Sequence, residues 1–338
     1  MIKRVAVVIL NWNGLDYLKK FLPTVLKHNI DYSEIYLADN NSTDDSVAFV
    51  QGNYPQIKII KNEINSGFAQ GYNDALLNIK AEYYVLLNSD VRVTDDWINP
   101  IITMMDKDTS IAACQPKIRS FNQPDYFEYA GAGGGFIDNL GFPFCRGRIF
   151  DTIEKDDGQY DDVKEVFWAS GACLFVRSEL FHKVNGFDGD FFAHMEEIDL
   201  CWRLKNLGYK IMYCPYSVVF HVGGGTLQYL NPKKTYLNFR NNLYLLFKNL
   251  PLKQLFQKIF IRMLFDGMAA IRFLVKGEVK HFNAVLKAHL DFYLSFNNLI
   301  AKRRKKIKRN DFQQVYRGSI VFQYFARKRK VFSKLNFK

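Results

Sequence analysis

Three carboxylates fall within four residues in the segment Glu196-Glu197-Ile198-Asp199, beside aromatic residues and at the expected start of a helix. On a helix, Glu196 and Asp199 share a face with Arg203, whereas Glu197 projects away from that face. A separately directed carboxylate beside an ion-paired face could act as a general base, because burial and like charges raise a carboxyl pKa towards neutrality. The structural alternative is that acids in a first helical turn simply complement the helix dipole.

A second candidate group follows an apolar run that is expected to form a strand. In Asn88-Ser89-Asp90, the first and third side chains point to the same side by strand periodicity. Such a pair of oxygens suits a hard divalent cation that takes phosphate oxygens as further ligands. His221 ends another apolar run and precedes Gly223-Gly224-Gly225, which allow a backbone to approach a ligand closely. Each feature alone is also common in turns without a ligand.

The elements that must position these groups alternate along the first 118 residues. Strands are predicted at 5–10, 35–38, 57–60, 83–87 and 111–114, and helices at 17–26, 46–50, 69–79 and 97–105. This alternation is typical of a mostly parallel sheet covered on both faces, in which ligands bind at the carboxyl ends of the strands. Four successive strand ends carry Asn, Asp, Ser or Gly, which favours a binding site over turn and cap chemistry alone.

Beyond residue 118 the pattern changes twice. Residues 119–163 are irregular, first Gly-rich and then acidic, and we expect a mobile excursion near the site. Regular structure is expected again at 166–222, with strands at 173–176 and 211–213 and helices from 178 and at 197–207. Residues 235–300 are predicted to form amphipathic helices.

Composition excludes several classes of protein. Of the 338 residues, 48% are hydrophobic and 24% are charged, which is typical of a globular protein and not of a disordered or fibrous one. The five cysteines include no CxxC pair, so neither a disulfide framework nor a zinc ribbon is expected. This cysteine usage suits a reducing compartment, and no secretory signal opens the chain, so we expect a cytoplasmic location.

The net charge of +12 comes from the last part of the chain. Residues 301–338 contain 14 Lys and Arg against the single acid Asp311, whereas the rest of the chain is close to neutral. Such a basic, aromatic tail favours an anionic membrane surface as partner; nucleic acid is unlikely, because 1–300 carries no nucleic-acid-binding signature. The apolar stretch 255–275 is interrupted by charges, so it is expected to pack on the protein or lie in a membrane interface without spanning it.

Seven motifs occur in an order that resembles family 2 glycosyltransferases, most of all their rhamnosyltransferase- and galactofuranosyltransferase-like branch. The motifs lie at 7–13, 39–44, 65–73, 86–90, 170–172, 196–203 and 221–224. The resemblance implies an α/β, Rossmann-like A-type glycosyltransferase fold with a mostly parallel central sheet, followed by C-terminal amphipathic helices. It also implies a UDP- or dTDP-linked nucleotide-sugar donor, a divalent metal (Mn or Mg) as cofactor, and inversion at the anomeric carbon.

The same resemblance implies roles residue by residue. The residues implied in nucleotide-sugar binding are Asn11, Asp39, Asn65, Gly67, Asn73, Asn88, Ser89 and Gly171. Asp90 and His221 match the metal-binding positions. Glu197 falls on the position of the catalytic base, which is Asp in most relatives, and Glu196 and Asp199 belong to the same catalytic element. Which of Glu196 and Glu197 is the base stays open at this point.

These expectations combine into one function and two alternatives. We expect a catalytic glycosyltransferase domain at 1–234, a helical region at 235–300 and a basic tail at 301–338. The enzyme would move a sugar to a hydroxyl of a glycan or lipid-linked acceptor in cell-surface polysaccharide synthesis, peripherally at the inner face of the membrane. One alternative is a non-catalytic nucleotide sensor that binds nucleic acid or a membrane, and the other is a nucleotidyltransferase on the same sheet.

Overall fold

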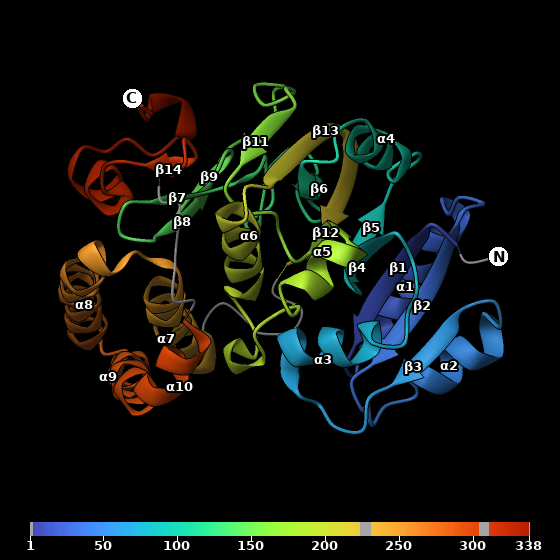
Figure 1. Ribbon diagram of the computed structural model, residues 1–338, viewed down its shortest axis with the longest axis horizontal. Coiled ribbons are helices and arrows are strands. Elements are labelled where there is room, and N and C mark those ends of the chain that lie inside the picture. The colour runs from blue at the N-terminus through green and yellow to red at the C-terminus, as the bar shows by residue number, and fades with distance from the viewer. Residues whose placement is uncertain (1–2, 224–230, 304–310, 338) are drawn as a thin grey trace.

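The computed structural model describes residues 3–223, 231–303 and 311–337 (Figure 1). The glycines Gly224 and Gly225 of the predicted His221 motif, and the part of the basic run beyond Arg303, lie outside the described residues.

A large sheet organises the first two thirds of the chain. Its strands are β1 (Val5–Asn11), β2 (Ser33–Asp39), β3 (Lys58–Lys61), β4 (Tyr83–Asn88), β5 (Val91–Val93), β6 (Ile111–Ser120), β11 (Lys164–Val166), β12 (Cys173–Arg177) and β13 (Lys210–His221). They follow the order β11-β13-β6-β12-β4-β1-β2-β3, and β5 pairs with β13. The pairs β1–β2, β1–β4, β2–β3 and β6–β13 are parallel, which confirms the predicted α/β class.

One strand departs from the predicted order. The antiparallel strand β12 lies between β4 and β6, so these two consecutive parallel strands are not neighbours. Strand β13 is also far longer than the expected 211–213, and its register shifts between Cys214 and Val218. A local apolar run predicts that a strand exists, but it carries no information on which distant strand pairs with it.

Helices cover both faces of this sheet, as predicted. They are α1 (Leu15–Lys27), α2 (Ser46–Asn53), α3 (Gly67–Leu76), α4 (Asn99–Lys107), α5 (Ser178–Lys183) and α6 (Glu196–Asn206). Side chains of β1 alternate between two cores: Val7 packs in the core that includes α1 and α4, and Val8 packs in the core that includes α3 and α6. This alternation is the period of two that a strand imposes on its side chains.

The excursion at 119–163 is not irregular, which corrects the sequence-based expectation. Its short strands β7 (Gly135–Asp138), β8 (Pro143–Cys145), β9 (Arg148–Ile149) and β10 (Thr152–Ile153) form a second sheet. These strands have two to four residues, too few to show a periodic pattern. Gly135 is required there, because a Cβ atom would lie 2.2 Å from the Trp168 ring.

The C-terminal segment completes this second sheet. Strand β14 (Val315–Tyr316) pairs in parallel with β7. The rings of Phe332 and Phe337 pack against Phe136 in tilted and edge-to-face arrangements, with ring centroids 5.0 and 5.3 Å away. Residues 311–337, which composition sets apart as a basic tail, therefore pack against a sheet that lies almost 200 residues earlier in the chain (Figure 1).

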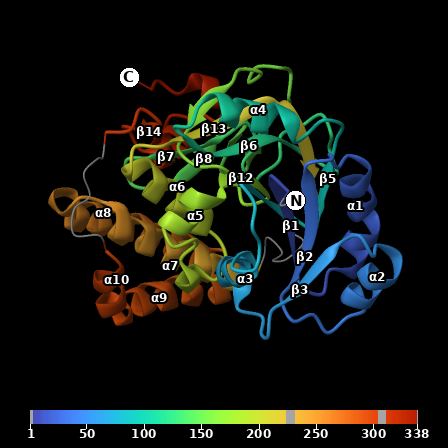
Figure 2. The same ribbon diagram turned by 45° about the vertical axis from the view of Figure 1, so that its right-hand side comes forward.

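Four helices form the expected C-terminal helical region: α7 (Pro232–Asn249), α8 (Leu252–Val275), α9 (Val279–Leu294) and α10 (Phe296–Lys302). Helix α7 contacts α6, α8, α9 and α10, and α8 packs beside α9. In both views α8 and α9 lie at the side of the molecule farthest from β3 (Figures 1 and 2). Within the described part of the chain, no helix combines the length and apolar character needed to cross a bilayer.

Candidate active site

A cavity of about 600 Å³ lies at the carboxyl ends of β1 and β4. The predicted residues that line it are Asn65, Gly67, Asn88, Ser89, Asp90, Gly171, Glu196, Glu197 and His221. They come from loops after β3 and β4, the loop before β12, the start of α6 and the end of β13. The structure therefore brings together groups that are separated by more than 150 residues, at the sheet edge where ligands bind in α/β folds.

The loop before α6 fixes the position of the carboxylates. The Phe192 carbonyl oxygen accepts hydrogen bonds from the backbone N–H groups of Phe68, at 2.7 Å, and Ala69, at 3.2 Å, at the start of α3. Gly67 makes this approach possible: its φ is +87°, and a Cβ atom there would lie 2.5 Å from the Phe192 ring. The loop is thus tied to the side of the cavity that Asn65 lines.

Helix α7 holds the same loop from the opposite side. The Asn241 amide nitrogen lies 2.8–2.9 Å from the backbone carbonyl oxygens of Phe191, Ala193 and His194. Within this loop Phe192, His194 and Met195 all have positive φ values, of 63°, 70° and 73°. Such backbone persists only where the surroundings over-determine it, and it is frequent at functional sites.

The two glutamates at the start of α6 both line the cavity. Each has one buried carboxyl oxygen, Oε2, that finds no hydrogen-bond partner among the described residues. Among the described residues Glu196 makes no ion pair. The prediction of an ion-paired helix face formed by Glu196, Asp199 and Arg203 is therefore wrong for Glu196. Only Asp199 pairs with Arg203, at 2.7 Å, and Glu196 instead turns towards the cavity beside Glu197.

Burial raises the pKa values of both glutamates. Burial raises the pKa of Glu197 to about 7, although backbone N–H groups at the helix start counteract it. Burial and the neighbouring charge of Glu197 raise the pKa of Glu196 well above its ordinary value. Glu196 therefore holds its proton more tightly than an ordinary glutamate, whereas Glu197, with a pKa of about 7, exists at neutral pH partly as a carboxylate that can take up a proton.

Asp90 and His221 form the other charged centre of the cavity. His221 Nε2 lies 3.1 Å from Asp90 Oδ1, and His221 Nδ1 lies 3.1 Å from Glu128 Oε2. Burial alone would lower the pKa of His221, but the charges of Asp90 and Glu128 outweigh burial and raise it well above the ordinary value. Burial likewise opposes ionisation of Asp90, yet the charge of His221 keeps its pKa below the usual range.

Asp90 and His221 could supply only some of the ligands of a divalent cation. Among the described residues, no group of three or more His, Cys, Asp or Glu side chains is arranged to hold a metal ion. The carboxylate of Asp90 and the imidazole of His221 nevertheless supply two adjacent donors in the cavity wall. They fit a cation that completes its shell with phosphate oxygens and water. Glu128 stands where it can orient the imidazole through Nδ1.

The model of the family described as "Glycosyl transferase family 2" matches residues 6–182, which is more than half of the chain. The chain belongs to glycosyl transferase family 2. The motif resemblance is thereby confirmed, and the protein is an enzyme of the glycosyltransferase class.

Two curated relatives of this transferase are rhamnosyltransferases. It is 26% identical to the N-acetylglucosaminyl-diphospho-decaprenol L-rhamnosyltransferase of Mycobacterium tuberculosis, over 64% of this chain and 75% of the relative. It is 28% identical to rhamnosyltransferase WbbL of Escherichia coli K12, over 64% of this chain and 83% of the relative. The similarity thus includes the predicted rhamnosyltransferase-like branch.

A solved structure supports the fold of the transferase. GalNAc-T7, solved with UDP, GalNAc and Mn²⁺, matches with a TM-score of 0.56 at 18% identity, over 72% of this chain and 48% of that one. The match spans about half the length of GalNAc-T7. At this identity it supports the A-type glycosyltransferase fold and nothing further.

Four predicted residues of the transferase lie outside the cavity lining. Asn11 and Asp39 are buried beside it, where Asn11 Nδ2 donates to Asp39 Oδ1 at 3.0 Å and to Ser46 Oγ at 2.9 Å. Asn73 donates to the Phe187 carbonyl at 2.8 Å and accepts from the Phe187 N–H at 2.9 Å. In this structure these side chains support the loops that surround the cavity.

Asp199, the fourth, anchors α6 to α7. Its carboxylate is fully buried and accepts from Arg203 at 2.7 Å, from Lys248 at 3.0 Å and from Asn249 at 2.8 Å. Burial would raise its pKa, but the charges of Lys248 and Arg203 hold the pKa far below the usual range. Asp199 therefore positions the helix that carries Glu196 and Glu197.

Replacement of Asp199 by Asn is expected to lower the free energy of unfolding of the transferase by about 3 kcal/mol, because two buried cations lose their shared partner. Urea denaturation measures this change. The matched control is Glu82→Gln, since Glu82 pairs with Arg4 at 2.9 Å on the surface. That variant should lose less than about 1 kcal/mol. Equal losses in the two variants would contradict the anchoring role.

Several lining residues were not selected from the sequence. They are Trp12, Tyr17, Asn40, Glu128, Phe192, His194, Lys233 and Lys234. His194 stands two residues before Glu196, so its proximity to the acidic cluster could have indicated it from the sequence. In the structure its buried Nε2 has no partner among the described residues. Glu128 offered none, because it lies in the excursion and its contact with His221 depends on tertiary structure.

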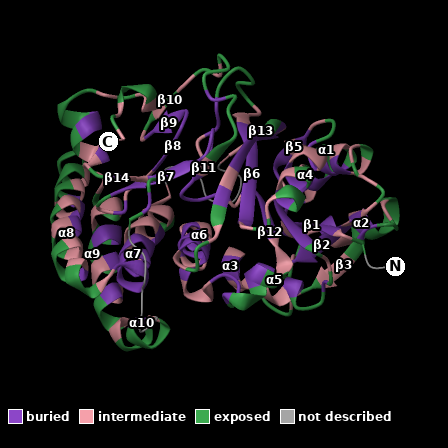
Figure 3. Cartoon of the chain, turned by 45° about the horizontal axis from the view of Figure 1, so that its top comes forward, coloured by how far each residue is buried: buried purple, intermediate pink, exposed green. Residues whose placement is uncertain are grey.

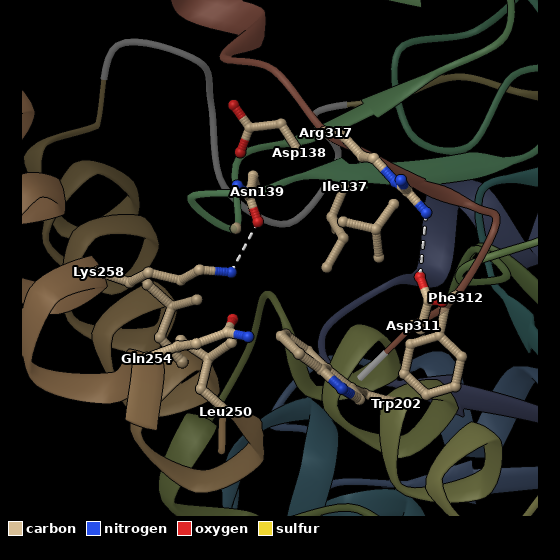
Figure 4. Close-up of a pocket in the computed structure, with 13 residues that line it drawn as sticks. Ile137, Asp138, Asn139, Trp202, Leu250, Gln254, Lys258, Asp311, Phe312 and Arg317 are labelled. Atoms are coloured by element: carbon tan, nitrogen blue, oxygen red, sulfur yellow. Dashed lines mark hydrogen bonds and ion pairs between the residues drawn. The ribbon is translucent and has the colours of Figure 1, made fainter. Parts of the chain in front are cut away.

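A second cavity of about 230 Å³ lies between β7, α8 and the C-terminal segment (Figure 4). Lys258 Nζ donates to Asn139 Oδ1 across it at 2.7 Å, and Arg317 pairs with Asp311 at 3.2 Å. None of the predicted site residues lines this cavity, so the larger cavity is the candidate active site of the transferase.

Proposed function

We propose that this glycosyltransferase moves a sugar from a UDP- or dTDP-linked donor to a hydroxyl of a glycan or lipid-linked acceptor, with inversion at the anomeric carbon. The observation that carries the proposal is that Glu197 and the Asp90–His221 pair face one cavity. The name of the mycobacterial relative agrees with it, because that protein is named for a rhamnosyl transfer to a diphospho-decaprenol-linked sugar. We place the reaction in cell-surface polysaccharide synthesis.

The chemistry follows from the charges in the cavity. The ionised Glu197 accepts the proton of the acceptor hydroxyl as that oxygen bonds to the anomeric carbon. The diphosphate leaves from the opposite side with the electron pair of the broken C–O bond. Burial and the charge of Glu197 raise the pKa of Glu196 and so favour its protonated form, which can donate a hydrogen bond to the sugar. A single base, with the carboxylates of Asp90 and Glu128 both paired with His221, fits a single displacement with inversion.

The leaving diphosphate needs positive charge around it. Asp90 and His221 would hold a divalent cation, Mn or Mg, which when bound supplies Lewis-acid stabilisation of the departing oxygens. The Mn²⁺ in the GalNAc-T7 structure supports this assignment by analogy of fold. Lys233 and Lys234 line the same cavity at the start of α7 and add positive charge from the protein itself.

A donor screen tests the proposal. The purified protein is heated with UDP- and dTDP-sugars, with and without MnCl₂ or MgCl₂, while unfolding and release of nucleoside diphosphate are followed. The expected result is stabilisation by one donor that requires the metal, and slow hydrolysis of that donor to a sugar of inverted configuration, detected by NMR. Stabilisation without any turnover, even with candidate acceptors, would favour the nucleotide sensor. Release of pyrophosphate from a nucleoside triphosphate would favour a nucleotidyltransferase.

We also propose that the enzyme works peripherally at the inner face of the membrane, in the cytoplasm. The lipid-linked acceptor in the mycobacterial relative's name and the basic C-terminal part of this chain support that location.

A further inference from the structure

We propose that the outer face of the α8–α9 helix pair is the surface by which the enzyme docks on an anionic lipid bilayer. The inference rests on the peripheral location proposed above, but not on the transfer chemistry in the cavity. It answers the question that the sequence leaves open for 255–275, namely whether its apolar side chains are covered by protein.

The apolar side chains of α8 are largely uncovered. The outward residues, spaced three or four apart along the whole helix, are Phe256, Phe260, Leu264, Met268, Ile271 and Val275, and each is more than half exposed. Helix α9 continues this surface with Leu286, Leu290 and Leu294, which are also more than half exposed. The exposed and half-buried colouring of α8 at the edge of Figure 3 shows the same orientation. An apolar patch of this extent marks an interaction site.

The inner side of α8 carries a buried ion pair. Arg262 and Asp266 are 5% and 1% exposed, and they pair with each other at 2.8 Å. His289 of α9 lies 3.3 Å from the second oxygen of Asp266. A buried ion pair therefore faces the protein while a continuous row of large apolar side chains faces the surroundings, which is unusual for a helix on the surface of a soluble domain. This orientation suits a helix that lies in a membrane interface.

The charges around the patch identify the partner. Between residues 252 and 294, the exposed charged side chains are Lys253, Arg272, Lys276, Lys280 and Lys287, and all are basic. The three acids of this stretch are buried or half-buried. A symmetric dimer through this face would bring two basic surfaces together, whereas anionic head groups complement the basic residues and acyl chains cover the apolar ones.

The dimensions agree with a helix lying flat. The 24 residues of α8 span about 36 Å at 1.5 Å per residue, and its apolar stripe runs from end to end. On its other side, Arg262 contacts Asn242 of α7 and Asp266 pairs with His289 of α9, so α8 can present only one face to lipid.

Vesicle flotation tests the proposal with the full-length protein. The wild type is expected to float with phosphatidylglycerol vesicles and much less with phosphatidylcholine vesicles. The double variant Phe260→Asp/Met268→Asp is expected to bind phosphatidylglycerol vesicles at least about ten-fold more weakly, since it removes two inserted groups and adds two negative charges. The matched control is Leu77→Asp at the end of α3, where the side chain is 76% exposed and far from α8.

The outcomes separate the possibilities. Equal flotation of the double variant and the wild type would overturn the proposal, as would a wild type that stays unbound. Sedimentation without lipid is the second measurement: a dimer that the double variant dissociates would assign the face to a second copy and also overturn it. Donor hydrolysis is measured on the same samples. A wild type that hydrolyses the donor but does not bind vesicles would contradict this inference alone. A wild type that binds vesicles but does not hydrolyse any donor would contradict the proposed function alone.

Discussion

Replacement of Glu197 by Gln is expected to abolish sugar transfer while the donor still binds. Glutamine keeps the size of the side chain but cannot accept a proton, so the rate should fall by roughly 10²- to 10⁴-fold, the usual contribution of a general base. Donor binding, followed by thermal shift, should stay close to that of the wild type, because the change removes no positive charge from the cavity. Full activity of the variant would contradict the assignment.

Two companion variants sharpen this experiment. Glu196→Gln should cost much less activity, because burial and the charge of Glu197 favour the protonated form of Glu196, which glutamine resembles. Glu197→Asp retains the carboxylate one methylene further back, and it should keep part of the activity. A larger loss in Glu196→Gln than in Glu197→Gln would transfer the role of base to Glu196.

The wild-type rate should also rise with pH. With a pKa of about 7 for Glu197, the ionised fraction grows from about one tenth at pH 6 to about nine tenths at pH 8. Since only the ionised form accepts a proton, kcat/KM should climb through this range and then level off. The rising limb should be absent from the residual activity of Glu197→Gln.

Replacement of Asp90 by Asn is expected to have the second large effect, a loss of transfer on the order of 10²- to 10³-fold. The amide preserves the shape of the side chain but removes the negative charge that, beside His221, would bind the proposed divalent cation. Stabilisation of the variant by donor should no longer depend on MnCl₂.

The control for this variant is Asp95→Asn, because the Asp95 side chain is 93% exposed and lies outside the cavity lining. Its activity and metal dependence should match those of the wild type. If Asp90→Asn kept metal-dependent donor stabilisation, the cation would have to be held elsewhere.

The sequence predicted the parts of the site that depend on local pattern. Asn88, Asp90 and His221 end apolar strands, and a parallel sheet necessarily brings such ends to one edge. Glu197 was found because a cluster of acids at a helix start is visible in the sequence. The same local reasoning failed for Glu196, because whether a side chain pairs with its helix neighbour or faces a cavity depends on what packs around the helix.

The remaining parts depend on contacts between distant segments. Glu128 reaches His221 from the segment between β6 and β7, where it belongs to no helix or strand. Strand β14 joins β7 from the far end of the chain, and Asn241 of α7 contacts the loop before α6. None of these pairings leaves a trace in composition or spacing. They arise from tertiary packing, which a single sequence does not display.

The loop from Phe191 to Met195 has a consequence for protein engineering. Its carbonyl groups accept hydrogen bonds from α3 on one side and from Asn241 of α7 on the other. The loop therefore connects the N-terminal part of the fold to the C-terminal helices. The helices at 231–303 therefore cannot be exchanged with those of a relative as an independent cassette. A chimera whose new helices lack an equivalent of Asn241 would leave the segment before Glu197 unsupported. This would hold even if the chimera kept every cavity-lining residue of α6.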